Sequence, residues 1–400
     1  MAGGEALARD ADGRVVLVTG ALPGERVTAE LTEEHRSYAK ARVVAVLEPS
    51  PDRLATVPCP HVGRGCGGCS WQHVGPAAQS RAKVELVTDA LRRIGKLADP
   101  PVRLGPVLPT EGHRTTLRLA VDAEGRAGYR RAASHEVVDV DSCLVAHPLL
   151  AELLEDARFP GATEVTLRCG ARTGDRLALV TPRATGVRLP ADVAVVGTDE
   201  LHAGRRAWFW EEAAGRRWRI SARSFFQARP DGAEALVDAV RAAVDDAPEG
   251  PLLDAYGGVG LFAGTVAGDR RVTLIERSPS SVADARVNLA ETGGGGRPHV
   301  LRLDVERWRP AHAAVVVADP ARSGLGTRAV DRLAATGAER LVLVSCDAAA
   351  LGRDAALLQK AGYHLADATV VDLFPHTPHV EVVSRFASST SGRGAEHVAG

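Results

Sequence analysis

The chain has 400 residues, of which 45% are apolar and 25% are charged. These fractions exclude an intrinsically disordered chain, and the length predicts two or three domains. Lysine and arginine number 49 against 50 aspartate and glutamate, so the formal net charge of −1 does not by itself indicate a nucleic-acid ligand. No apolar run approaches the ~20 residues that span a bilayer, and no secretory signal is visible. We therefore expect a cytoplasmic protein with no membrane contact and no obligate protein partner.

The first 50 residues predict a small β-barrel. Apolar and β-branched runs are interrupted by Pro23-Gly24, as in short antiparallel strands joined by turns. We expect an OB-like barrel over residues 1–50, followed by a proline-rich linker. Residues 51–225 then mix strand-like runs, turns and a helical stretch at 76–97, which predicts a mixed α+β central domain.

Strands and helices alternate regularly in the C-terminal part of the chain. Near-continuous apolar strands separated by helical stretches predict a Rossmann-like α/β domain over residues 226–386, with a doubly wound, mostly parallel sheet. The expected strands are 252–256, 272–276, 300–303, 314–319 and 341–345, with a closing strand at 380–386. The Ser- and Gly-rich residues 387–400 predict a disordered tail.

A glycine-rich turn follows the first of these strands, in Asp254-Ala-Tyr-Gly-Gly-Val-Gly. Its glycines let a ligand approach the backbone at the carboxyl edge of the sheet. Glu276 ends the next strand, where an acidic side chain accepts hydrogen bonds from ribose hydroxyls, and Asp304 follows the third strand, within reach of an adenine amino group. The turn fits NAD as well as S-adenosylmethionine (SAM), and glycines that merely permit a tight turn are a further alternative. The acidic residue before the turn and the glycine spacing favour the methyl donor.

The six cysteines indicate metal binding or catalysis, because disulfides are rare in a reducing cytoplasm. Cys59, Cys66 and Cys69 lie close together in a glycine-rich loop, with Cys143 as the best distant fourth ligand. Four thiolates suit a 4Fe–4S cluster. Zinc, held by the three loop cysteines and a nearby histidine, is the alternative.

Cys346 ends another predicted strand, at the edge where open sheets bind ligands. Methylation of uracil C5 needs a thiolate that adds to C6, because the resulting enolate makes C5 nucleophilic, and a base that then removes the C5 proton. Cys346, Glu381 and Asp319 supply the nucleophile, the base and a hydrogen-bonding group for the pyrimidine edge. A packing cysteine and a solvated strand-end carboxylate are the alternatives for the first two.

Several short motifs in a constant order resemble the RNA uracil-C5 methyltransferase family, in the branch with an N-terminal TRAM domain and an iron–sulfur cluster. The motifs are Ala21-Leu-Pro-Gly-Glu-Arg-Val, Cys59-Pro-His, Cys66-Gly-Gly-Cys-Ser-Trp-Gln-His, Ser224-Phe-Phe-Gln-Ala, Asp254-Ala-Tyr-Gly-Gly-Val-Gly, Asp319-Pro-Ala-Arg, Ser345-Cys-Asp and His376-Thr-Pro-His-Val-Glu.

The resemblance implies a SAM-dependent RNA methyltransferase, and the added barrel and cluster favour 23S ribosomal RNA over the alternative substrate, the T-loop of tRNA. It implies that the donor is contacted by Gln227, Tyr256, Gly258, Glu276, Asp304 and Asp319. It matches the catalytic motifs at Cys346, Glu381 and Asp319, and the fourth cluster ligand at Cys143. Alternatives from other classes are an RNA-binding protein with an inactive methyltransferase domain and an iron–sulfur, NAD-linked oxidoreductase.

Four motifs depart from the family pattern, and one of them is the cluster loop, which is one residue longer between its first two cysteines. Asp-Pro-Pro-Arg has Ala321 at its third position, Ser-Cys-Asn-Pro continues here as Asp347-Ala348, and the cysteine of Tyr-Cys-Gly-Val-Gly is Gly257. The chemical groups of the reaction remain, so the departures bear on the substrate more than on the reaction. Asp347 adds a carboxylate beside the nucleophile, which is expected to raise the pKa of the thiol.

Basic residues gather locally although the net charge is near zero. Arginines cluster within residues 114–131, and four more follow Trp208 and Trp210, at positions 216, 217, 219 and 223. Arginine interleaved with aromatic residues suits phosphate contacts and base stacking, and solvated arginines are the alternative. We expect the barrel and central domain to bind RNA, while the target base is extruded into the sheet domain at a cost of a few kcal/mol.

Overall fold

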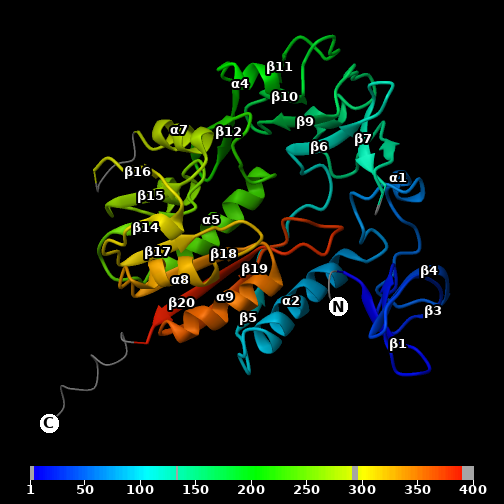
Figure 1. Ribbon diagram of the computed structural model, residues 1–400, viewed down its shortest axis with the longest axis horizontal. Coiled ribbons are helices and arrows are strands. Elements are labelled where there is room, and N and C mark those ends of the chain that lie inside the picture. Colours follow the sequence, from blue (N-terminus) through cyan, green and yellow to red (C-terminus); the bar gives the residue numbers. More distant parts are fainter. Residues whose placement is uncertain (1–3, 132–133, 291–295, 390–400) are drawn as a thin grey trace.

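Figure 1 shows the computed structural model of the chain, which describes residues 4–131, 134–290 and 296–389. The predicted tail at 387–400 lies outside the described residues from position 390 onward, and residues 387 and 388 belong to the last strand. Among the described residues, none of the helices has the length and apolar character needed to cross a membrane.

The N-terminal part forms one four-stranded sheet. Its strands are β1 (Ala6–Arg9), β2 (Val15–Thr19), β3 (Arg26–Glu34) and β4 (Tyr38–Glu48), in the order β1-β2-β4-β3. The strands pair antiparallel except for β2 and β4, which run parallel, so the sheet is mixed. Alternate residues such as Val16, Val18, Ala39 and Ala41 face a small core, as expected for strands with one buried face.

A six-stranded sheet forms the central part, in the order β11-β10-β9-β6-β7-β8. Its strands are β6 (Thr116–Val121), β7 (Ala127–Arg130), β8 (Val137–Asp139), β9 (Glu164–Cys169), β10 (Arg176–Thr181) and β11 (Val193–Gly197). The short helix α3 (Pro148–Ala151) connects β8 to β9, whereas α1 (Pro60–Gly63) precedes the sheet in the chain and α4 (Thr198–His202) follows it. The hairpin of β12 (Trp208–Ala213) and β13 (Arg216–Ser221) comes after α4.

The C-terminal part is built on an eight-stranded sheet, in the order β16-β15-β14-β17-β18-β20-β19-β5. Its strands are β5 (Val102–Leu104), β14 (Leu252–Ala255), β15 (Val272–Glu276), β16 (His299–Arg302), β17 (Val315–Ala318), β18 (Arg340–Ser345), β19 (Tyr363–Val370) and β20 (Val382–Ser388). The five strands from β16 to β18 are parallel, and β20 runs antiparallel between β18 and β19.

Helices cover both faces of this sheet, which explains why its strands lack polar alternation. Leu252 faces a core that includes Leu236 and Val240 of α5 (Pro230–Val244), whereas the next residue, Leu253, faces a second core. The second core takes its helical residues from α2 (Pro76–Arg93), α8 (Gly326–Ala334) and α9 (Ala348–Lys360). The shorter helices are α6 (Leu261–Thr265), α7 (Pro279–Asn288) and the 3-10 turn η1 (Val305–Arg307).

The segment 76–104 packs with the C-terminal sheet and not with the central one. Figure 1 shows α2 lying alongside α9, and β5 extends the sheet by pairing in parallel with β19. A division at residue 225 therefore separates parts that form one core. The sequence pattern predicted a helix here, but local propensity carries no information about which sheet edge a short strand will join.

A buried carboxylate anchors the hairpin β12–β13 to α7. Asp284 is fully buried and accepts hydrogen bonds from Arg219 Nε at 2.8 Å, from the Ser221 amide at 2.8 Å and from Ser224 Oγ at 2.6 Å. The contacts fix the start of the segment 224–227, which leads into the cavity described below. They also engage Arg219 within the protein, although the sequence suggested it for phosphate contacts.

We expect Asp284→Ala to lower the free energy of unfolding by about 3 kcal/mol or more, because it leaves buried donors without an acceptor. Urea denaturation measures this change. The control is Asp238→Ala, which removes an exposed pair with Arg241 at 2.7 Å and should cost about 0.5 kcal/mol or less. Equal losses in the two variants would contradict the anchoring role.

Candidate functional site

The parallel strands bring several polar residues to one edge of the sheet. Ala255, the last residue of β14, pairs with Ile275 on one side and with Ala318 on the other. Tyr256, Glu276 and Asp319 therefore stand near one another at the carboxyl ends of three adjacent strands. This edge is where open α/β sheets bind ligands.

The antiparallel pair β18–β20 places the predicted nucleophile and base at the same edge. Ser345, which ends β18, pairs with Val382, which begins β20. Cys346 follows the first of these residues and Glu381 precedes the second, so the two lie side by side. Asp319 follows β17, the parallel neighbour of β18 on its other side.

All eight residues predicted for catalysis and donor binding line one cavity of about 640 Å³. They are Gln227, Tyr256, Gly258, Glu276, Asp304, Asp319, Cys346 and Glu381. Such a volume lies within the range of small-molecule sites. The structure thus brings together residues that the sequence separates by more than a third of the chain.

The glycine-rich turn and Glu276 form a connected cradle. One carboxylate oxygen of Glu276 accepts a hydrogen bond from the Gly258 amide at 3.1 Å, and the other accepts from the Ser278 amide at 2.6 Å. Gly258 has φ +54° and open space where a Cβ would stand, so a ligand can reach this backbone. The Tyr256 hydroxyl donates to Glu306 at 3.3 Å, which leaves its ring as the part available to a ligand.

Asp254 supports the turn from below. Its side chain is fully buried and accepts a hydrogen bond from the Ala263 amide at 2.9 Å, within α6. Burial raises the pKa of this carboxyl group to about 7. Gly257 lies above it, and a Cβ there would stand 2.6 Å from the Leu274 side chain, which fits the absence of the family's cysteine at this position.

The three groups predicted for catalysis, Cys346, Asp319 and Glu381, all have raised pKa values. Burial, then the neighbouring Glu381 and Asp319, raises the pKa of the Cys346 thiol to about 11. Burial also raises the pKa of Asp319 to about 7, and burial together with Asp319 raises the pKa of Glu381 well above its usual range. Arg322 acts in the opposite direction and lowers the pKa of both Cys346 and Glu381. The carboxyl pair therefore retains a proton near neutral pH.

Asp347 serves a helix and not the thiol. Its Oδ1 accepts the amide of Ala350 at 2.8 Å, so it is the N-cap of α9. Aspartate and asparagine cap helices about equally well, which accounts for the exchange at this position. The carboxylates that raise the pKa of Cys346 are Glu381 and Asp319.

Arg322 and His379 also line this cavity, although the sequence analysis assigned no role to either residue. Arg322 Nη2 lies 3.2 Å from His379 Nδ1, and both side chains face the same cavity as Cys346. Each belongs to a motif already noted, Asp319-Pro-Ala-Arg and His376-Thr-Pro-His. Their position within those motifs is the sequence feature from which a role at the site could have been predicted.

The four candidate metal-binding cysteines line a second cavity. Cys59, Cys66, Cys69 and Cys143 come together there with Tyr129. Burial raises the pKa of the Cys69 thiol to about 11. Within the described ranges, no set of three or more histidine, cysteine, aspartate or glutamate side chains is arranged to hold a metal ion. The cavity nonetheless gathers all four sulfurs, and the buried Tyr129 hydroxyl beside them has no hydrogen-bond partner among the described residues.

The surface arginines are mostly paired within the protein. Arg118, Arg126 and Arg131 form ion pairs with Glu164, Asp122 and Glu136. Arg114 instead lines both the cysteine cavity and the larger cavity. Near the latter, Trp208 is 43% exposed, and Phe225, which lines the cavity, is 67% exposed.

The fold and this site define a SAM-dependent methyltransferase that carries an additional N-terminal domain. Residues 2–44 match the TRAM domain. Over 96% of the chain and all of its counterpart, the fold resembles that of a tRNA (uracil-54, C5)-methyltransferase of Pyrococcus abyssi in complex with S-adenosyl-L-homocysteine, with a TM-score of 0.72 and 22% sequence identity.

Sequence comparison defines the family more closely. The chain is 38% identical to an uncharacterized RNA methyltransferase of Streptomyces coelicolor, covering 98% of this chain and 91% of the relative. It is 34% identical to a 23S rRNA (uracil(1939)-C(5))-methyltransferase of Methylococcus capsulatus, covering 94% and 92%. The chain belongs to the RNA uracil-C5 methyltransferase family.

The opposing charges around Cys346 predict opposite effects on its thiol pKa. Arg322→Ala should raise that pKa and slow alkylation of Cys346 by iodoacetamide at pH 8 by about 3–10-fold, because alkylation requires the thiolate. Glu381→Gln should lower the pKa and accelerate alkylation. Mass spectrometry of the Cys346 peptide measures both rates. Arg328→Ala, at an exposed position on α8, is the control, and equal rates in all variants would contradict the electrostatic coupling.

Proposed function

We propose that this chain methylates C5 of a uracil in 23S ribosomal RNA, with Cys346 as nucleophile. The observation that carries the proposal is the side-by-side placement of Cys346 and Glu381 in the cavity that the donor-binding residues line. The 34% identity to the Methylococcus capsulatus 23S enzyme, over nearly the whole chain, supports the choice of RNA.

In the proposed reaction, the Cys346 thiolate adds to uracil C6 and forms a carbon–sulfur bond. Electron density moves to O4, and C5 becomes nucleophilic. A carboxyl group that keeps its proton can donate a hydrogen bond to this enolate, and burial raises the pKa of Asp319 in that direction. Arg322 assists by favouring the thiolate.

Glu381 completes the reaction. Once C5 carries the methyl group, the Glu381 carboxylate takes the C5 proton, and the carbon–sulfur bond breaks to restore the aromatic pyrimidine and the thiolate. A base with a raised pKa is better matched to this step at neutral pH than an exposed glutamate, which would be too weak.

The cradle of Gly258 and Glu276 fits the methyl donor. Glu276 is oriented by two backbone amides and suits the ribose hydroxyls, and Gln227 and Asp304 complete the lining. When bound, SAM supplies an electrophilic methyl group on a sulfonium ion. The carboxyl-rich lining complements that positive charge.

The exposed aromatic residues near the cavity support RNA binding beside it. Phe225 lies in the cavity lining, and Trp208 is exposed on the neighbouring hairpin with Arg219 5.5 Å from its ring. Exposed rings of this kind stack on unpaired bases. They are therefore suited to hold the strand from which the target base is extruded.

The reaction is tested by trapping its covalent intermediate. Glu381→Gln cannot remove the C5 proton, so the methylated RNA should remain attached to Cys346 and migrate with the protein on a denaturing gel. Cys346→Ala should give no adduct and should lower methyl transfer from labelled SAM at least ~1,000-fold. Full activity of Cys346→Ala would exclude the mechanism. Methyl transfer to tRNA transcripts but not to fragments of 23S ribosomal RNA would show that the substrate is tRNA.

We further propose that Cys59, Cys66, Cys69 and Cys143 hold a 4Fe–4S cluster. The four cysteines line one cavity, and the Tyr129 hydroxyl beside them, which has no hydrogen-bond partner within the described part of the chain, could donate a hydrogen bond to a sulfur atom there. When bound, a cluster supplies cross-linking between the cysteine loop and residue 143. Methylation transfers no electrons, so its role is structural.

The cluster is tested by metal content. Anaerobically purified protein should contain about four iron and four sulfide per chain, with broad visible absorbance, and Cys143→Ala should lose most of both. The control is Cys169→Ala, since Cys169 is buried in the core of the central sheet and is not among the residues that line the cavity of the other four. One zinc per chain without iron would overturn the assignment.

A further inference from the structure

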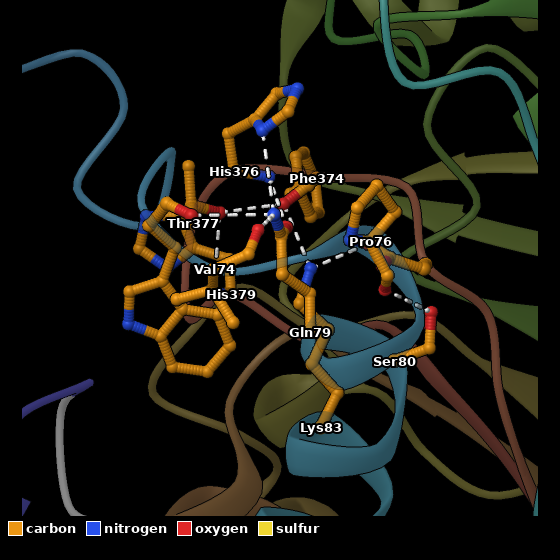
Figure 2. A network of polar contacts seen from close by, with 11 residues as sticks. Val74, Pro76, Gln79, Ser80, Lys83, Phe374, His376, Thr377 and His379 are labelled. Atoms are coloured by element: carbon orange, nitrogen blue, oxygen red, sulfur yellow. Dashed lines mark hydrogen bonds and ion pairs between the residues drawn. The ribbon is translucent and has the colours of Figure 1, made fainter. Parts of the chain in front are cut away.

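The loop 371–381 carries three residues that line the active cavity, Phe374, His379 and Glu381, yet it is held from outside by α2. Figure 2 shows the contacts between this loop and the N-terminal half of the helix. Within the loop, His376 has φ +64°, a left-handed conformation that is uncommon for histidine and persists only where the surroundings impose it.

Gln79 imposes that conformation from α2. Its side chain is 1% exposed, and its Oε1 accepts the His376 amide at 2.6 Å, while its Nε2 donates to the Val74 carbonyl at 2.8 Å. On the other side, the Trp71 amide donates to the His376 carbonyl at 2.8 Å. Both backbone polar groups of His376 are thus satisfied by the segment 71–79.

Lys83 holds the same loop one helical turn further on. It is fully buried, and its Nζ donates to Asp372 at 2.5 Å and to the Phe374 carbonyl at 2.8 Å. Burial lowers the pKa of this amine, and the ion pair with Asp372 opposes that shift. A buried lysine is costly unless such partners satisfy it.

The restrained loop ends at the proposed base. The Val371 amide donates to the Glu381 carbonyl at 2.8 Å, which closes the loop at its two ends. From there the Glu381 side chain lies buried beside Asp319, and His379 reaches Arg322. The position of both side chains therefore depends on how the loop between them and β19 is held.

We propose that Gln79 and Lys83 are positioning residues, which hold the loop 371–381 so that Glu381 and His379 face the reactive cavity. Its consequence for catalysis rests on the proposed function, whereas the restraint on the loop does not. Misplacing a catalytic base by even about 1 Å can cost about 100-fold in rate. Loss of the restraint slows proton removal from C5 more than thiol addition to C6.

Gln79→Leu tests this inference, because leucine has a similar volume but makes no hydrogen bonds. Hydrogen exchange in the peptide 371–381 should become at least ~10-fold faster, with the remaining peptides unchanged. Methyl transfer should fall about 10–100-fold in kcat with the KM for SAM nearly constant, and the covalent RNA adduct should accumulate. Ser80→Ala is the matched control. Among the described residues, the Ser80 hydroxyl donates only to the Pro76 carbonyl of its own helix, at 3.3 Å, so its removal should change neither readout.

Gln79→Glu is a second variant, which decides the matter if leucine prevents folding. In its protonated form, the glutamic acid can accept from the His376 amide and donate to the Val74 carbonyl, whereas its charged form faces that carbonyl with no proton to donate. Loop protection relative to wild type should therefore be near normal in acid and fall as pH rises. The titratable groups around this position are Lys83 on α2, Asp372 and His376 on the loop, and Glu111 and His113 on the segment before β6.

The outcomes separate this inference from the proposed function. Unchanged protection of 371–381 in folded Gln79→Leu, or pH-independent protection in Gln79→Glu, overturns the positioning role. If loop protection falls but wild-type protein transfers no methyl group to RNA, the restraint stands and the proposed function fails. If methyl transfer is intact in Gln79→Leu despite a loosened loop, the positioning role in catalysis is overturned.

Discussion

Burial of two carboxyl groups beside one thiol is the physical constraint on which this site depends. Each of the three groups resists ionisation because water is excluded from it, and acidic neighbours add to the effect for Cys346 and Glu381. Their shared edge must therefore keep protons or receive a cation. Arg322 supplies part of that compensation within the protein, and a sulfonium ligand would supply more.

Sheet topology creates this proximity. Five parallel strands bring Tyr256, Glu276 and Asp319 to one edge by the ordinary geometry of an open α/β sheet. The antiparallel strand β20 then enters between β18 and β19, and its register places the residue before it beside the residue after β18. Glu381 reaches Cys346 because of that reversal of direction, since a parallel strand would present its N-terminal end at the opposite edge.

A helix from the first quarter of the chain, α2, completes the C-terminal domain. The apolar face of α2 packs beside α9, while its Gln79 and Lys83 hold the loop that leads to β20. The cysteine-bearing segment joins the same contact, because Trp71, two residues after Cys69, donates to His376. This continuity connects the cysteine loop to the loop that carries Glu381 into the active cavity.

Composition, periodicity and motifs determined the alternation of strands and helices, the glycine turn with Glu276, and the identities of Cys346, Asp319 and Glu381, because each of these is written in a short stretch of chain. The positions of Arg322 and His379 in the cavity were not predicted, although both residues lie within motifs noted in the sequence. The packing of residues 76–104 with the C-terminal sheet could not be predicted from the sequence. The sequence suggested that Asp347 would disturb the neighbouring Cys346, whereas the structure shows that Asp347 is the N-cap of α9. These features depend on contacts between residues that are far apart in the chain. Desolvation, ion pairing and strand register arise only when such residues come together in the folded protein, so no local segment of sequence specifies them.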